Sequence, residues 1–119
     1  TDFEGTIMYN RDIPSHDGMP SIPENELNSV MHICLPILGG MRIMGTDMLE
    51  SMGHKVQIGN NTTINLEPDS RSETDRLFNL LSQNATDIAP MQDMFWGAYW
   101  GCCLDQYGIR WMFNYATAQ

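Results

Sequence analysis

An internal repeat constrains the fold of this sequence more than any other feature. Four residues of the first half return in the second half, each displaced by 68 positions: Cys34, Gly40, Arg42 and Met44 recur as Cys102, Gly108, Arg110 and Met112. A fixed offset shared by several residues is typical of a duplicated structural unit. We therefore expect two copies of one module, the first ending near Asp47 and the second near Tyr115.

The second half predicts the order of elements in this module. Asn61, Thr63 and Asn65 alternate with Thr62, Ile64 and Leu66, which is the period of a strand with one apolar face and predicts a strand over residues 56–67. Ser70 followed by Glu73 matches a capping box and predicts a helix over residues 71–83. Three strand-like runs follow, at residues 88–96, 98–104 and 109–116. The predicted order is β-α-β-β-β.

The first half predicts only the last three strands of the module. They cover residues 5–12, 30–37 and 41–47, with Gly39-Gly40 as a hairpin turn and residues 13–23 as a long surface loop. Within one domain of 119 residues, an incomplete first module (1–53) would then precede a complete second module (54–119). Either the missing strand and helix precede Thr1 in the natural protein, which we favour, or a partner chain supplies them. Both alternatives predict association of chains, because an open sheet edge invites pairing.

Charge and composition exclude several classes of partner. With 15 acidic and 6 basic residues, the chain has a net charge of -9, which repels phosphate backbones and anionic lipids. No apolar stretch approaches the roughly 20 residues of a membrane span, and the first residues lack the layout of a signal peptide. Three cysteines without a CxxC pair favour a reducing compartment. We expect no nucleic acid or membrane partner and a cytoplasmic location.

Six ordered segments carry a resemblance to a known family. They are MHICLPI at 31–37, RIMGTD at 42–47, GNN at 59–61, ETDRLFNLLS at 73–82, PMQDMFWGAYWG at 90–101 and DQYGIRWMFNY at 105–115. Together they resemble the PhnB-like (glyoxalase/bleomycin-resistance-like) branch of the vicinal oxygen chelate superfamily. The resemblance implies an α+β fold of paired β-α-β-β-β modules, which form a cupped mixed or antiparallel sheet of the glyoxalase/dihydroxybiphenyl dioxygenase kind. It also implies a homodimer.

The resemblance indicates where metal ligands would stand. In metal-dependent relatives, strands of both modules supply the side chains that hold a divalent ion, and the matching positions here are Met44, Asn61 and Met112. A thioether is soft and a carboxamide is weak, so neither suits a hard divalent ion. The three histidines lack HxH or HExxH spacing. We expect no metal site of the superfamily kind and no cofactor.

Strand alternation predicts a ligand-binding face. Trp111, Phe113 and Tyr115 form an apolar row that should pack under the helix, and the opposite row should face away from it. The candidate ligand-binding residues are Arg110, Met112 and Asn114 of the last strand, Asn61, Thr63 and Asn65 of residues 56–67, and Met44 and His32 of the first module. Polar groups set among methionines suit a small-molecule site. A sheet with one solvated face also shows such residues without any ligand.

Two further groups have a structural and a functional interpretation. His32 and Cys34 could act as base and nucleophile, but a cysteine in an apolar strand is usually a small buried hydrophobe, so we assign no catalytic residue. Aromatic residues flank Gly97, where a core or subunit interface is the ordinary explanation and a stacking wall for a planar ligand the functional one; they are Phe95, Trp96, Tyr99 and Trp100.

Three functions are compatible with these residues. The first is a metal-free homodimer that binds a small organic molecule in the sheet cup. The second is a divergent metal-dependent glyoxalase-type lyase or isomerase, or a dioxygenase. The third is a fold that mainly serves dimerisation within a larger complex. Some members of the branch are described as demethylubiquinone methyltransferases, but the sequence lacks the glycine-rich loop that such an enzyme needs after a strand.

Overall fold

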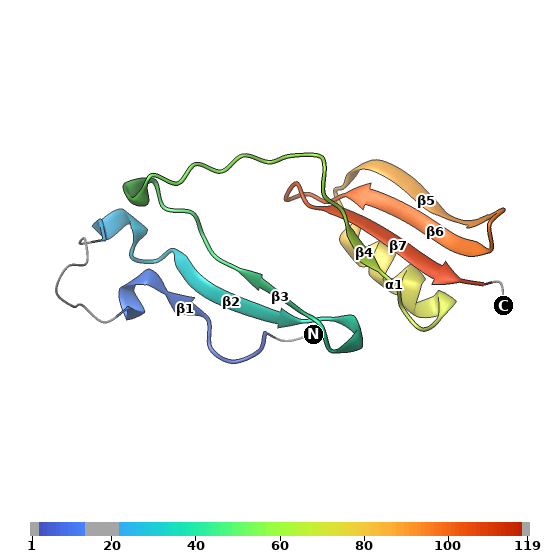
Figure 1. The fold of residues 1–119 in the computed structure, drawn as a ribbon, viewed down its shortest axis with the longest axis horizontal. Coiled ribbons are helices and arrows are strands. Elements are labelled where there is room, and N and C mark those ends of the chain that lie inside the picture. Colours follow the sequence, from blue (N-terminus) through green and yellow to red (C-terminus); the bar gives the residue numbers. More distant parts are fainter. Residues whose placement is uncertain (1–2, 14–21, 118–119) are drawn as a thin grey trace. The chain divides into compact units, whose positions relative to one another are not determined.

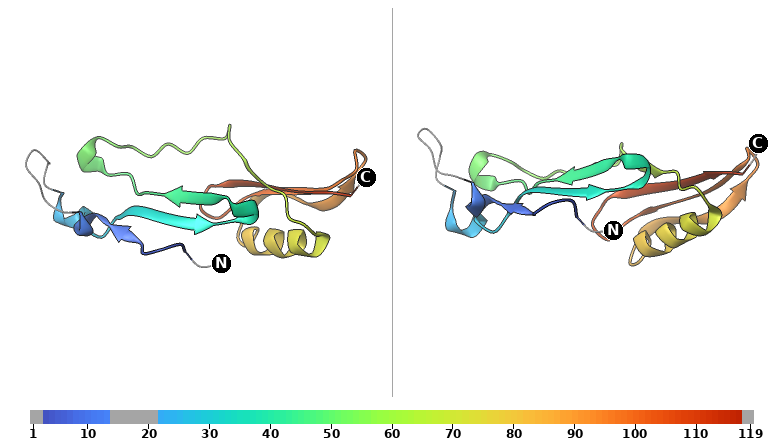
Figure 2. Two further views of the ribbon diagram at one scale, coloured as in Figure 1. Left: turned by 60° about the horizontal axis from the view of Figure 1, so that its bottom comes forward. Right: turned by 90° about the horizontal axis from the view of Figure 1, so that it is seen from below.

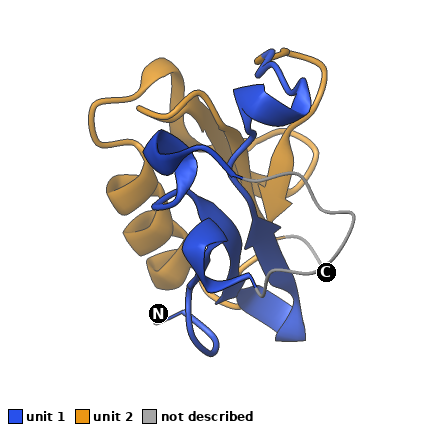
Figure 3. Cartoon of the chain, turned by 90° about the vertical axis from the view of Figure 1, so that its left-hand side faces the viewer, with its two compact units in different colours: residues 1–57 blue, residues 58–119 orange. Residues whose placement is uncertain are grey.

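The computed structural model describes residues 3–13 and 22–117 and has the expected α+β fold (Figure 1). The chain divides into two units, residues 1–57 and 58–119 (Figure 3). The N-terminal unit contains β1 (Met8–Tyr9), β2 (Val30–Pro36) and β3 (Arg42–Gly45). The C-terminal unit contains β4 (Ile64–Leu66), α1 (Arg71–Leu81), β5 (Thr86–Met94), β6 (Ala98–Leu104) and β7 (Arg110–Ala116). No helix in the described ranges has both the length and the apolar character to cross a bilayer.

The C-terminal unit is a mixed sheet with one helix on it. Its strand order is β4-β7-β6-β5, and β4 runs parallel to β7 whereas the other neighbours are antiparallel. Helix α1 connects β4 to β5 and lies along one face of the sheet (Figure 2). The predicted order of strand, helix and three strands is therefore confirmed in this half of the chain.

The helix begins where the capping residue predicts. The Ser70 hydroxyl accepts a hydrogen bond from the Glu73 backbone N–H at 3.1 Å, which satisfies one of the free donors at the helix start. The Glu73 carboxylate turns outward and pairs with Arg76 at 2.5 Å instead of completing the capping box. The helix ends at Leu81, two residues before the predicted end, and Leu80 is exposed although its spacing placed it on the apolar stripe.

The core of this unit lies between α1 and the sheet. Phe113 of β7 has no exposed surface, and its ring meets Phe78 of α1 edge to face at 5.4 Å between centroids. Cys103 of β6 is also buried, and its thiol lies 3.9 Å from the Leu81 carbonyl of α1. The predicted apolar row on the last strand therefore packs under the helix, with Phe113 at its centre.

A glycine allows β5 and β6 to approach each other closely. A Cβ atom at Gly101 would lie 2.6 Å from the Met91 sulfur and 2.9 Å from the Ala89 carbonyl oxygen. Real Cβ atoms do not make such short contacts, and the carbonyl belongs to the backbone, which moves little. Met91 thus fills the space that the missing side chain leaves.

The N-terminal unit is an antiparallel sheet in the order β1-β2-β3. Its β2–β3 hairpin has the same register as the β6–β7 hairpin: Cys34 is opposite Met44 as Cys102 is opposite Met112, and Pro36 is opposite Arg42 as Leu104 is opposite Arg110. Both turns contain a glycine with positive φ, Gly40 at 76° and Gly108 at 87°, a conformation that other residues rarely adopt. The repeated residues therefore occupy equivalent places in two hairpins.

Two predicted strands are much shorter in the structure. Residues 5–12 contribute only Met8–Tyr9, after which the chain forms a 3-10 turn at Asn10–Asp12. Residues 56–67 contribute only Ile64–Leu66, because Ile64 already pairs with Trp111 and β7 begins at Arg110. Upstream residues would have to pair with the turn before β7. The predicted loop at 13–23 lies mostly outside the described residues, since 14–21 are not described.

The turn between β6 and β7 is closed by a buried carboxylate. Asp105 is 9% exposed and accepts hydrogen bonds from the Tyr107 and Ile109 backbone N–H groups, both at 2.9 Å, and from the Trp111 indole at 2.7 Å. Three bonds to one ionised group hold the start of β7 in place.

We expect Asp105→Ala to lower the free energy of unfolding by about 3 kcal/mol, because three donors lose a charged acceptor. Urea unfolding followed by tryptophan fluorescence measures the change. Asp93→Ala is the matched control, since Asp93 is exposed and, among the described residues, pairs with Arg71 alone; its loss should be much smaller. Equal losses for the two variants would contradict the structural role given to Asp105.

A second polar contact fastens the helix to the sheet. The Tyr99 hydroxyl of β6 donates to the Asp75 carboxylate of α1 at 2.5 Å, and the Arg71 guanidinium lies 4.1 Å from the centre of the Tyr99 ring. This hydrogen bond, followed by burial, raises the pKa of Tyr99 above its ordinary value. The stabilisation is therefore present below the unfolded pKa of tyrosine and is lost as pH rises through the raised folded value.

Asp75→Asn should bring the pKa of Tyr99 back toward its ordinary value, because the carboxylate that favours the neutral phenol is gone. Absorbance titration of phenolate measures this as the loss of the latest-titrating tyrosine. Asp69→Asn removes an exposed carboxylate of the same unit and should leave the titration unchanged. An unshifted curve for Asp75→Asn would show that Tyr99 owes its pKa to burial alone.

Candidate functional site

Among the described residues of the C-terminal unit, helix α1 covers one face of the sheet and no helix covers the other. Because Phe113 packs on α1, its neighbours Arg110, Met112 and Asn114 on the alternate positions of β7 face away from it. The strand register adds Asn65 of β4 opposite Met112. It also adds Trp100, Cys102 and Leu104 of β6, opposite Asn114, Met112 and Arg110. These seven residues define the helix-free face.

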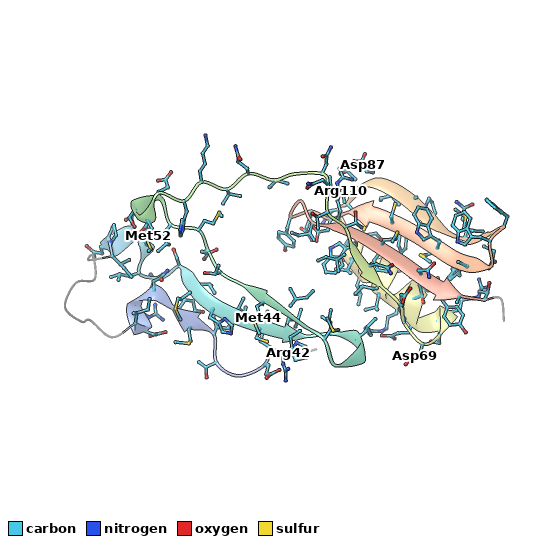
Figure 4. All side chains as sticks on the ribbon, viewed as in Figure 1. Arg42, Met44, Met52, Asp69, Asp87 and Arg110 are labelled. Carbon is cyan, nitrogen blue, oxygen red and sulfur yellow. The ribbon has the colours of Figure 1, made fainter. Side chains whose placement is uncertain are left out.

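Arg110 is the cation of the helix-free face. Its guanidinium lies 3.9 Å from the Asp87 carboxylate, a loose pair in which the Asp87 side chain is 68% exposed (Figure 4). Its Nε atom is buried and has no hydrogen-bond partner among the described residues. A guanidinium has five donors in a planar fork, and the Arg110 side chain is 31% exposed, so its terminal N–H groups can meet an acceptor from outside the protein.

Asn114 connects the helix-free face to a shallow hollow. Its amide donates to the Glu67 carboxylate at 3.4 Å, a long hydrogen bond. The two residues share the wall of a cavity of about 290 Å³, which is also lined by Pro68, Asp69, Tyr115 and Ala116. This cavity approaches the size of a site for a very small organic molecule.

The structure brings together half of the predicted site. Asn65, Arg110, Met112 and Asn114 share the helix-free face. Asn61 and Thr63 precede β4 and are exposed, so strand alternation does not place them on this face as predicted. Met44 and His32 lie in the N-terminal unit, on β3 and β2.

Sequence reasoning missed several residues of the face. Trp100, Cys102 and Leu104 are among them, and the alternation of side chains along residues 98–104 is the signal that indicates them. Asp87 has a positive φ of 48° and is placed beside Arg110 by an irregular part of β5, which no local pattern indicates.

The aromatic residues around Gly97 do not form one cluster. Phe95 and Trp96 stack edge to face at 5.0 Å at the tip of the β5–β6 hairpin, where Phe95 is 97% exposed. Tyr99 faces α1, and Trp100 lies on the helix-free face. A core role is therefore wrong for Phe95 and Trp96, because a hairpin turn projects them beyond the last paired residues.

The positions that the resemblance gives to metal ligands hold thioethers and a carboxamide in exposed or half-exposed places. Met44 is 65% exposed, Asn61 is exposed and Met112 is half-buried. Within the described ranges, no three His, Cys, Asp or Glu side chains gather to hold a metal ion. These donors do not fit a hard divalent ion.

Comparison with known proteins supports the fold and leaves the chemistry open. No family model matches the sequence, and no curated protein matches it either. The crystal structure of protein PA1353 from Pseudomonas aeruginosa is similar, with a TM-score of 0.76 and 26% identity over 97% of this chain and 78% of that one. A protein from Bacillus cereus described as "Putative 3-demethylubiquinone-9 3-methyltransferase, PhnB protein" has a TM-score of 0.65 and 19% identity over 94% of this chain and 78% of that one. These structural neighbours fit the PhnB-like family that the motifs indicate.

The two adjacent cysteines of β6 point to opposite faces of the sheet, so their reactivity shows which face the helix covers. Burial raises the pKa of the Cys103 thiol, with smaller contributions from Asp105 and Cys102, so its reactive thiolate is scarce. Cys102 is only half-buried and points to the helix-free face.

Maleimide at pH 8 should therefore modify Cys102 well before Cys103, and tandem mass spectrometry distinguishes the adjacent sites. In Cys102→Ser the faster of these two modifications should disappear. Preferential modification of Cys103 would mean that the helix covers the opposite face from the one described.

Proposed function

We propose that the helix-free face binds a small organic molecule that carries a hydrogen-bond-accepting group, without the hard divalent ion of metal-dependent relatives. The observation that carries this proposal is the guanidinium of Arg110, whose side chain is 31% exposed and whose pair with Asp87 is loose, at 3.9 Å. Its terminal N–H groups can form charge-assisted hydrogen bonds with a carboxylate or carbonyl of a ligand.

The neighbours of Arg110 suit such a ligand. Met112, two residues along β7, offers a flexible thioether surface for apolar parts of the molecule. Asn65 and Asn114 supply carboxamides that both donate and accept. A few polar groups set into an adaptable apolar surface are typical of small-molecule sites.

We also propose that the chain belongs to the vicinal oxygen chelate superfamily and acts as a homodimer. The ordered motifs support membership, and so does the fold shared with PA1353 at a TM-score of 0.76. Analytical ultracentrifugation tests the dimer, since a species of one chain at micromolar concentration would contradict it.

Methyl transfer is not part of the proposal. The described segment that joins β4 to α1 runs from Glu67 to Ser70 and contains Pro68 but no glycine. A nucleotide-type cofactor site needs a glycine-rich loop there, because the backbone must approach the ligand closely. The methyltransferase wording therefore stays with the protein from Bacillus cereus.

A thermal-shift screen of small carboxylic acids and carbonyl compounds tests the site. A ligand at 100 times its Kd should stabilise the protein by about 2.7 kcal/mol, seen as a higher Tm. Arg110→Gln should abolish that shift, because it removes the charged donors. Arg76→Gln is the matched control, since Arg76 lies on the exposed side of α1 and should leave the shift intact.

Two results would contradict the proposal. The first is a screen in which no compound shifts Tm at millimolar concentration. The second is stoichiometric divalent metal in the purified protein together with loss of ligand binding after chelation, which would favour the metal-dependent lyase, isomerase or dioxygenase.

A further inference from the structure

We propose that the N-terminal unit binds Cu(I), a soft monovalent cation, through His32, Cys34 and Met44, with Met8 as a fourth donor. We call these four residues the sulfur–imidazole cluster. The proposal concerns β1, β2 and β3 alone and does not depend on the small-molecule site of the C-terminal unit.

Strand register places the four side chains on one face. Met8 is opposite His32 in the β1–β2 ladder, beside a β-bulge between Met8 and Tyr9, and Cys34 is directly opposite Met44 in the β2–β3 ladder. Opposite residues project to the same side, with Cβ atoms about 4.5–5.5 Å apart. His32 and Cys34 are two residues apart on β2, so they also share that face at a spacing of roughly 6.6 Å.

This spacing is suitable for one ion between the strands. The thiol of Cys34 is short, whereas histidine and methionine are longer and can lean toward it from neighbouring positions. Cys34 is 6% exposed, Met8 is 39% exposed and Met44 is 65% exposed. The cluster thus combines a sheltered thiol with solvent-accessible thioethers, which leaves a path for an ion to enter. Figure 4 shows Met44 and Arg42 on β3.

The donor types select the ion. Thiolate and thioether sulfur are soft ligands that favour Cu(I), and imidazole also binds copper. A hard or borderline ion would need more oxygen, nitrogen or thiolate donors than this face offers, since the described residues contain no group of three His, Cys, Asp or Glu. The thioether of Met44 does not suit a hard divalent ion, but it is a suitable ligand for Cu(I).

The charged neighbours of the cluster are compatible with a bound thiolate. Arg42 lies two residue pairs beyond the Cys34–Met44 pair in the ladder and forms an ion pair with Glu4 at 2.5 Å. The hydrogen bond from Arg42 to Glu4 is the main cause of the raised pKa of Arg42, and Cys34 adds to it as a weaker one. When Cu(I) binds, a copper–sulfur bond replaces the S–H bond of Cys34 and the proton passes to solvent.

The repeat provides an internal control. Positions 34 and 44 correspond to Cys102 and Met112, which pair in the same register on β6 and β7. The position of His32 is occupied by Trp100 in the second copy, and an indole is no metal ligand. The C-terminal unit therefore has the sulfur pair without the imidazole.

The test is an anaerobic Cu(I) titration in competition with bicinchoninate, whose coloured complex measures the Cu(I) that the protein has not bound. We expect one equivalent of Cu(I) to bind the unmodified protein. Cys34→Ser, His32→Gln and Met44→Leu should each weaken binding by at least about tenfold, since even supporting groups around a metal contribute about 10–100-fold. The double variant Cys102→Ser with Met112→Leu should bind as the unmodified protein does.

Met44→Leu is the decisive variant, because its exposed position makes misfolding an inadequate explanation for lost affinity. Circular dichroism confirms the fold of every variant. Unchanged affinity in Met44→Leu or Cys34→Ser would overturn the proposal, and so would binding that depends on Cys102. X-ray absorption of the bound ion should show both sulfur and nitrogen neighbours, and a spectrum with sulfur alone would exclude His32.

Discussion

Burial of Phe113 against Phe78 determines which side of the C-terminal sheet is left for the candidate site. A strand alternates its side chains, so fixing Phe113 under α1 sends Arg110, Met112 and Asn114 to the other side. A slip of one residue would exchange the two rows and bury the guanidinium under the helix. Two further contacts stabilise the same register. Asp105 holds the start of β7, and the hydrogen bond from Tyr99 holds β6 against α1. The candidate site thus depends on core packing on the opposite face.

The two hairpins show how one register accommodates different packing. In the C-terminal unit, Gly101 of β6 is opposite Phe113 of β7, whereas in the N-terminal unit Ile33 of β2 is opposite Gly45 of β3. Each pair combines one large residue with a glycine, but the large residue has changed strands. The face that carries this pair therefore differs between the copies, although the other face retains its cysteine, arginine and methionine.

Local signals in the sequence predicted local structure well. The Ser70 cap located the helix start, and the glycines of the turns located both hairpins, because each acts through backbone geometry within a few residues. Strand length is not a local property: residues 56–63 have a strand pattern, but β7 offers them no paired partner. Asn61 and Thr63 were assigned to the site from that pattern, and in the structure they lie before β4 begins. The position of Asp87 beside Arg110 depends on a bulge in β5, which no local sequence pattern predicts.

The shortness of β4 has a consequence for how the helix-free face moves. Only three residues join β4 to β7, in a parallel ladder at the edge of the sheet. Parallel pairing is slightly weaker per residue, and edge elements with few hydrogen bonds open at a small fraction of the global unfolding free energy. Asn65 therefore sits on a segment that can detach transiently while β5, β6 and β7 stay folded. We therefore expect local opening of β4 to displace Asn65, whereas Arg110, Met112 and Asn114 on β7 keep their places in the sheet.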